Sequence, residues 1–169
     1  MRSSNLFTIT LFLLLSTVTL KAQTVGQGAF MMGGFLNFSI DKFEAEDKAR
    51  TYFTVAPSIG FYVIDDLAAG LNLSYSSVSI EGNSNTTTSL APFVRYYVFN
   101  PFFVEAQFGF SLDKDGGSYF ATDIGYSWFV SRNVAVEPMI FYINTNSDIE
   151  GLARSSFGFS VGIQTFIGR

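Results

Sequence analysis

The sequence predicts an all-β protein: an eight-stranded antiparallel up-and-down transmembrane β-barrel, preceded by a cleaved signal peptide. The first observation is composition, because 48% of the 169 residues are hydrophobic and only 14% are charged, against about 25% charged in a soluble domain. The second is that apolar and polar residues alternate after residue 28, which is typical of strands. The third is that clusters of Gly, Asn, Asp and Ser divide the chain into eight such segments, as turn chemistry predicts.

Residues 1–22 are expected to be a secretory signal peptide. A short positive start containing Arg2 precedes an apolar stretch from Leu6 to Leu20, and the small residue Ala22 follows. That order is typical of a signal peptide. The alternative, a membrane anchor, needs about 20 apolar residues to span. We therefore expect residues 23–169 to form one barrel domain, although the large Leu20 leaves the cleavage site open by a residue or two.

The eight predicted strands are long enough for a tilted membrane strand, which needs about 9–11 residues. In chain order they cover residues 29–40, 51–64, 67–79, 87–99, 102–112, 118–130, 134–145 and 155–167. Short turns follow the second, fourth and sixth strands, at residues 65–66, 100–101 and 131–133. Longer loops follow the others, at residues 41–50, 80–86, 113–117 and 146–154. This alternation of short and long connections is typical of outer-membrane barrels, and an even strand number places both termini at the short-turn rim.

Each strand has one apolar face. In 51–64 the odd positions run from Phe53 to Val63 and are all apolar, whereas the even positions include Thr54, Ser58 and Gly60. The strands 102–112, 118–130 and 155–167 show the same contrast. Alternation alone also fits a soluble barrel with its apolar face inside, so the charged residues have to decide between the two.

Four charged residues fall well within strands, all on the less apolar face: Arg95, Glu105, Asp123 and Glu137. A soluble barrel needs many charged residues on its outer face, and this face is built mainly of Gly, Ala, Ser, Tyr and Phe. We therefore assign it to the barrel interior and the apolar face to lipid, where an Arg or Lys at mid-plane costs about 2–4 kcal/mol.

Aromatic residues on the apolar face lie near both strand ends, as expected for the two membrane interfaces. Those near the short turns are Phe30, Phe61, Phe102 and Trp128. Those near the long loops are Phe38, Phe53, Tyr75, Phe120, Tyr142 and Phe157.

The residues that are absent from the sequence argue against several functions. The chain has no Cys and no His, so it lacks a thiol nucleophile, a Ser-His-Asp triad and a His-ligated metal. We expect neither an enzyme nor a bound cofactor or metal. The net charge of −4 argues against nucleic-acid binding, which needs a basic surface.

The four interior charges are predicted to form an ionic cluster. The turn at residues 100–101 places Arg95 and Glu105 opposite each other on neighbouring strands. Glu137 is expected at a similar height, with Asp123 and Gln107 nearby. The cluster could satisfy buried polar groups in a filled lumen, form a gate or selectivity ring, or act as an acid/base pair.

Apolar residues on the interior face allow two interpretations. They could fill the lumen, because eight strands leave an interior just wide enough for side chains. They could instead line a path for a small hydrophobic ligand. The residues are Phe35, Phe93, Tyr97, Phe103, Phe129, Met139 and Phe141.

With this strand number, alternation, loop asymmetry and leader, residues 23–169 resemble the small eight-stranded outer-membrane barrels, such as OmpX, OmpW and the membrane domain of OmpA. The resemblance implies the outer membrane of a Gram-negative bacterium, with periplasmic termini. The implied partners are outer-membrane lipid, lipopolysaccharide and the barrel-assembly machinery, with a possible extracellular ligand on loops 41–50, 80–86, 113–117 and 146–154.

The resemblance implies a structural or surface-interaction role, for example in adhesion. The alternative is a narrow pore or a transporter of small, apolar molecules. Enzymatic members of this group do not match, because their usual catalytic His has no counterpart here. The chain also departs from the family at its end, where the last aromatic residue, Phe166, lies three residues before the C-terminus.

Overall fold

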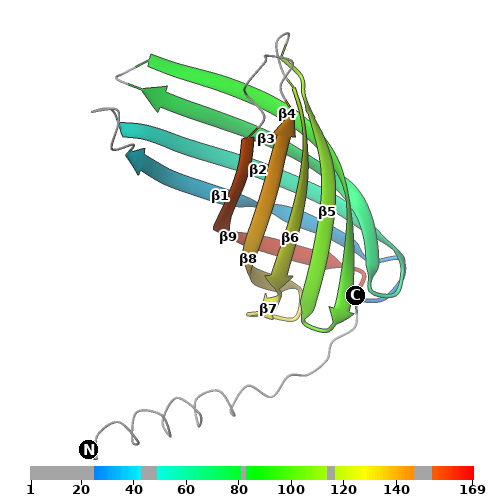
Figure 1. Ribbon diagram of the computed structural model, residues 1–169. Coiled ribbons are helices and arrows are strands. Elements are labelled where there is room, and N and C mark those ends of the chain that lie inside the picture. The colour runs from blue at the N-terminus through cyan, green and yellow to red at the C-terminus, as the bar shows by residue number, and fades with distance from the viewer. Residues whose placement is uncertain (1–24, 43–48, 81–82, 114–116, 147–153) are drawn as a thin grey trace, which may run out of the picture.

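The computed structural model describes residues 25–42, 49–80, 83–113, 117–146 and 154–169, and the predicted signal peptide lies outside this part of the chain. The described residues are all β (Figure 1). Figure 1 labels β1 (Phe30–Lys42), β2 (Ala49–Ile64), β3 (Leu67–Ile80), β4 (Asn83–Phe99), β5 (Phe102–Ser111), β6 (Ser118–Tyr126), β7 (Trp128–Phe129), β8 (Val134–Asn146) and β9 (Arg154–Ile167).

The strands form one antiparallel sheet that closes on itself. Neighbours along the chain pair from β1 to β6, β8 pairs with β9, and β9 pairs with β1. Both β6 and β7 pair with β8, so together they occupy one strand position. The fold is therefore the predicted eight-stranded up-and-down barrel.

The predicted strand 118–130 is interrupted at Ser127. Its backbone N–H donates to the carbonyl of Pro101 over 2.9 Å, outside the ladder with β8. Its hydroxyl is turned into the lumen and donates to Glu137 over 2.6 Å. The prediction of an unbroken strand was wrong here because these bonds draw the residue out of the sheet.

The predicted loop 80–86 is also largely strand. β3 extends to Ile80 and β4 begins at Asn83, and these two residues are paired. Thr86, Thr87 and Thr88 belong to the ladder, which suits β-branched residues despite their polarity. Two other predicted loops, 41–50 and 146–154, are shorter than expected, because β1 reaches Lys42, β2 begins at Ala49, β8 reaches Asn146 and β9 begins at Arg154. The predicted loop 113–117 is not shortened, since β5 ends at Ser111 and β6 begins at Ser118.

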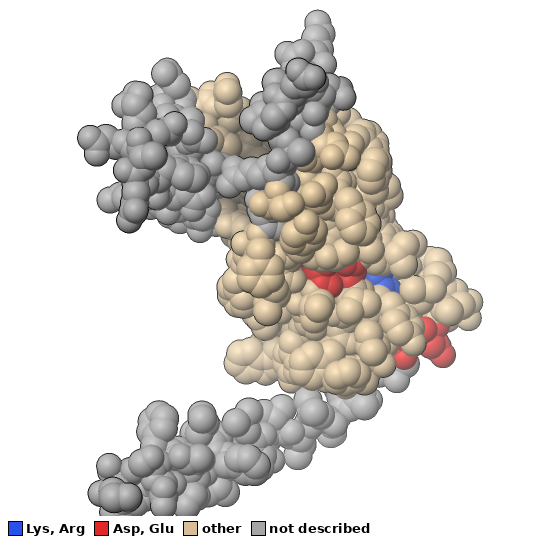
Figure 2. Space-filling model, viewed as in Figure 1, with Lys and Arg blue, Asp and Glu red and all other residues tan. Residues whose placement is uncertain are grey.

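The outer face of the barrel is apolar. In β5 exposed and buried residues alternate strictly from Phe102 to Phe110, with the predicted apolar face outside. The predicted rim aromatics whose side chains are described are all exposed: Phe30, Phe53, Phe61, Tyr75, Phe102, Phe120, Trp128, Tyr142 and Phe157. The described part of the face in Figure 2 is almost entirely tan, with only small red and blue areas. Phe38 has no described side chain.

We call the half of the barrel near residues 65–66, 100–101 and 130–133 the turn-side half. Its interior is filled by a cluster of buried apolar and aromatic residues: Val25, Ala29, Met31, Tyr62, Ala68, Phe93, Tyr97, Phe103, Ala135, Met139 and Phe166. The segment before β1 helps to close this end. Gly28 donates its N–H to Tyr62, and the carbonyl of Val25 accepts from Asp66.

The opposite, loop-side half is less complete. β1 and β9 share only seven residue pairs, from Phe30–Ile167 to Leu36–Val161, whereas β1 and β2 share thirteen. Beyond Leu36, β1 leans away with β2, β3 and β4, and β9 rises beside β8 (Figure 1). We call this partly paired junction between β1 and β9 the seam.

Candidate functional site

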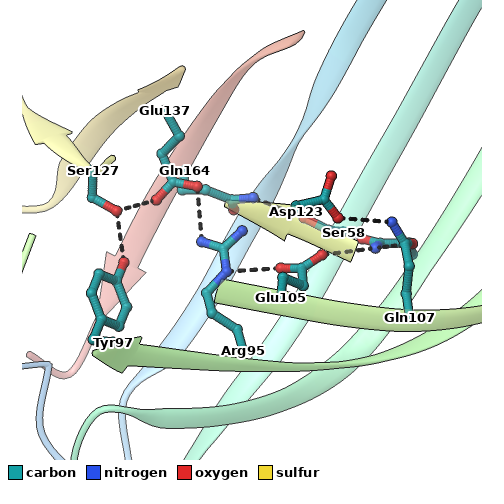
Figure 3. Close-up of polar contacts among 10 residues, drawn as sticks. Ser58, Arg95, Tyr97, Glu105, Gln107, Asp123, Ser127, Glu137 and Gln164 are labelled. Carbon is teal, nitrogen blue, oxygen red and sulfur yellow. Dashed lines mark hydrogen bonds and ion pairs between the residues drawn. The ribbon is translucent and has the colours of Figure 1, made fainter. Parts of the chain in front are cut away.

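The centre of the lumen holds an ionic cluster built from three strands (Figure 3). Arg95 on β4 lies opposite Glu105 on β5, and its Nε donates to Glu105 Oε2 over 2.8 Å. Its Nη1 donates to Glu137 Oε2 on β8, also over 2.8 Å. Arg95 is 2% exposed and Glu137 is fully buried. Ion pairs so shielded from water depend on good geometry and on further hydrogen bonds.

Further hydrogen bonds satisfy the second oxygen of Glu137. Ser127 Oγ donates to Glu137 Oε1 over 2.6 Å, and the hydroxyls of Ser127 and Tyr97 lie 2.7 Å apart. The Arg95 guanidinium also sits 3.9 Å from the centre of the Phe103 ring, where the ring attracts a cation. The guanidinium therefore joins the ionic cluster to the aromatic core of the turn-side half.

A second set of polar contacts leads from Glu105 towards the loop-side half. Asn72 Nδ2 lies 3.4 Å from Glu105 Oε1 and 2.9 Å from Gln107 Oε1. Gln107 Nε2 donates to Asp123 Oδ2 over 3.3 Å. Asp123 thus lies at the edge of the network, as predicted, but the ion pairs of Arg95 go to the two glutamates. The set has one guanidinium for three carboxylates.

The loop-side lumen contains a pocket of about 230 Å³. Its wall is mostly hydroxyl and amide side chains: Asn37, Thr54, Asn72, Ser74, Ser76, Ser89, Gln107, Thr145 and Ser160. Three aromatic rings, one carboxylate and two aliphatic side chains complete it: Phe35, Tyr119, Phe141, Asp123, Ala56 and Ile143. Hydroxyls on neighbouring strands pair across the wall, with 3.0 Å from Thr54 to Ser76 and 2.9 Å from Ser74 to Ser89.

A smaller cavity of about 20 Å³ lies among the cluster residues. It shares Phe35, Asn72, Gln107 and Asp123 with the larger pocket. Gln164 also lines it. The Nε2 of Gln164 donates to Ser58 over 3.1 Å, but its Oε1 is buried without a hydrogen-bond partner. A cavity of this size has room for one water molecule.

The interior apolar residues divide between the two halves. Phe93, Tyr97, Phe103 and Met139 are buried in the turn-side core, and Phe129 and Phe35 pack against it. Only Phe35 and Phe141 line the loop-side pocket. The seven residues therefore do not line one continuous apolar path, and most of them fill the lumen.

The sequence interpretation missed three participants. Ser127 and Tyr97 complete the shell of Glu137, and Asn72 connects Glu105 to Gln107. A signal was present for Asn72, an amide at an inward position of a strand with the same alternation as its neighbours. Ser127 likewise stands at an inward position of the predicted strand 118–130, but the strand break that accompanies its contacts has no sequence signal.

Comparisons with known proteins show the fold alone. No family model matches the chain, and no curated protein matches it in sequence. A solved structure from the de novo design of transmembrane β-barrels is similar, with a TM-score of 0.50 and 14% identity. The match covers 86% of this chain and 100% of that one. In the part of the chain that the structure describes, no helix could cross a membrane, and no group of three or more acidic side chains could hold a metal ion.

Proposed function

We propose that this protein is an integral outer-membrane barrel that does not conduct and has a structural or surface-interaction role. The observation that carries the proposal is the filled turn-side half, where the aromatic core and the ion pairs of Arg95 occupy the lumen. A closed lumen leaves the loop-side rim as the part available to partners. An extracellular ligand would bind there, on the loop-side segments 41–50, 80–86, 113–117 and 146–154, of which 80–86 belongs largely to the β3–β4 hairpin.

The outer surface supports a membrane location. Large apolar side chains are exposed on every strand from β1 to β9, including Trp128 on the two-residue β7. Soluble monomers rarely expose such continuous apolar area. The first and last described residues lie at the turn side, which faces the periplasm in barrels of this class. The partners of this location are outer-membrane lipid, lipopolysaccharide and the barrel-assembly machinery.

Single-channel recording of the refolded mature protein in a planar bilayer tests this proposal. Heat-modifiable gel migration of the same sample verifies that the barrel is folded. We expect folded, inserted protein without steady conductance, because the turn-side core blocks the lumen. Steady conductance that changes in Arg95→Ala would contradict the proposal and assign a gating role to the ionic cluster.

A second candidate function is transport of small, apolar molecules between the lumen and the surrounding membrane. The seam favours it, because β1 and β9 are unpaired beyond Leu36 and Val161 and Asn37 and Ser160 line the pocket beside this opening. In the double variant Asn37→Cys, Ser160→Cys, a disulfide bond would join β1 and β9 one residue pair beyond Leu36–Val161.

If the seam is a transport route, oxidising the double variant should lower uptake of the apolar dye Nile red by cells that produce it. Each single-Cys variant is the matched control, since it cannot form the cross-link. Equal uptake by the oxidised and reduced double variant would rule out the seam as the route.

A further inference from the structure

Among the described residues of the ionic cluster, three carboxyl groups, those of Glu105, Asp123 and Glu137, lie near one guanidinium, that of Arg95. Arg95 is shared between Glu105 and Glu137, whereas Asp123 receives a single hydrogen bond, 3.3 Å long, from the neutral amide of Gln107. Asp123 is only 8% exposed. A carboxylate with so little solvent is strongly disfavoured in its charged form unless a cation is near. Such a carboxyl group is either protonated or paired with a cation, and a cation bound in the pocket would hold Asp123 in its charged form.

The pocket above Asp123 has the chemistry of a cation site. None of the side chains lining it belongs to Lys or Arg, and three are the aromatic residues Phe35, Tyr119 and Phe141. Aromatic rings attract cations, and rings grouped in one pocket are the usual way to recognise quaternary ammonium groups. The surrounding hydroxyl and amide oxygens can accept hydrogen bonds from a donor on the ligand.

An unpaired acceptor next to this pocket is an independent indication. Gln164 is 4% exposed and its Oε1 has no hydrogen-bond partner. It lines the small cavity that shares Asp123 and Asn72 with the pocket. Buried acceptors are rarely left unpaired, so an N–H group of a ligand, or a water molecule held beneath it, would complete this site.

Size and donor set narrow the ligand further. A pocket of about 230 Å³ is smaller than the 300–1,000 Å³ typical of drug-sized ligands. A bare transition-metal or calcium ion is disfavoured, because the described residues offer no group of three or more His, Cys, Asp or Glu side chains to hold one. We propose that the loop-side pocket binds a small organic ammonium ion, with Asp123 as its counter-ion and the three aromatic residues beside it.

Isothermal titration calorimetry tests the proposal by measuring how tightly the refolded mature barrel in detergent binds choline chloride. The matched neutral probe is 3,3-dimethylbutan-1-ol, which has the shape of choline without its charge, and sodium chloride corrects for ionic strength. We expect choline to bind and the alcohol to bind at least about tenfold more weakly. Equal binding of the two probes, or no binding of choline, would overturn the proposal.

Variants place the binding in the pocket. Asp123→Asn should weaken choline binding at least about tenfold, whereas Asp113→Asn, at an exposed carboxylate of the same half, should change it less than about twofold. In a second variant, Phe141→Leu, the affinity for choline should fall several-fold. This variant provides the test if heat-modifiable gel migration shows that Asp123→Asn does not fold. Choline binding unchanged in a folded Asp123→Asn, or in Phe141→Leu when that variant decides, would overturn the proposal.

Discussion

The turn-side and loop-side halves are built from the same strands but have opposite interiors. In the turn-side half large inward side chains such as Met31, Tyr62 and Phe103 are completely buried. In the loop-side half the inward positions of the same strands carry Thr54, Ser74 and other small polar residues around a pocket. The outer face carries large apolar side chains in both halves, as Phe61 and Phe53 of β2 show. The difference shows that large inward side chains fill the half in which β1 and β9 are paired, whereas small polar inward residues leave the half beyond the seam hollow.

The largest effect is expected from removing the one cation of the cluster. Arg95→Ala leaves Glu105 and Glu137 buried without their partner, which should lower the free energy of unfolding by about 3–5 kcal/mol. Urea unfolding of the barrel refolded into lipid vesicles measures this loss. Arg132→Ala, in an exposed turn, is the control and should change stability by less than about 0.5 kcal/mol. Equal effects of the two substitutions would mean that the cluster does not stabilise the turn-side half.

A pair of glycine substitutions compares the packing of the halves directly. A Cβ on Gly125 would collide with the Phe103 ring, which is completely buried. A Cβ on Gly158 would come 2.5 Å from Cζ of Phe141, a ring that borders the pocket and can move into it. We expect Gly125→Ala to cost about 1–3 kcal/mol and Gly158→Ala clearly less. The same unfolding experiment decides this, and a larger loss for Gly158→Ala would reverse the comparison.

Two serine substitutions sharpen the comparison for hydrogen bonds. Ser127→Ala removes the bonds to Glu137 and Tyr97 in the closed half, and unpaired buried groups there should cost about 1–3 kcal/mol. Ser74→Ala removes the contacts of its hydroxyl with Ser89 and Tyr119 at the wall of the pocket. Water in the pocket can replace this hydroxyl, so the loss should stay below about 1 kcal/mol. Similar unfolding midpoints for the two variants would show that water replaces the lost hydroxyl equally well in both halves.

The smallest expected effect concerns local opening rather than global stability. The N–H groups of β1 that point towards β9 are paired up to Leu36 and unpaired in the described residues beyond it. Hydrogen exchange in detergent micelles should therefore be faster at these groups in residues 37–42 than in residues 30–36. Uniform protection along β1 would mean that the seam is closed in solution.

Most of the fold could be predicted from the sequence, because alternation and turn residues act locally. The strand β5 and its two faces follow directly from the order of apolar and polar residues, and the turn at residues 100–101 fixes the register of Arg95 with Glu105. The strand ends near residues 80–86 could not be predicted from the sequence. The Asn, Ser and Thr residues there are as polar as those of a loop, whereas Thr is β-branched and is also common in strands. The break at Ser127 depends on a hydroxyl that reaches a glutamate ten residues away, and periodicity carries no sign of it.

The short seam also has a consequence for the order of assembly. The other ladders join strands that follow one another along the chain, apart from the two residues of β7, so each can form as a local hairpin. The seam joins Phe30 to Ile167, and bringing such distant residues together carries the largest loop-closure entropy in the molecule. We therefore expect a curved open sheet to form first and the seam to pair last. With only seven residue pairs, the seam is also where the finished barrel should first come apart.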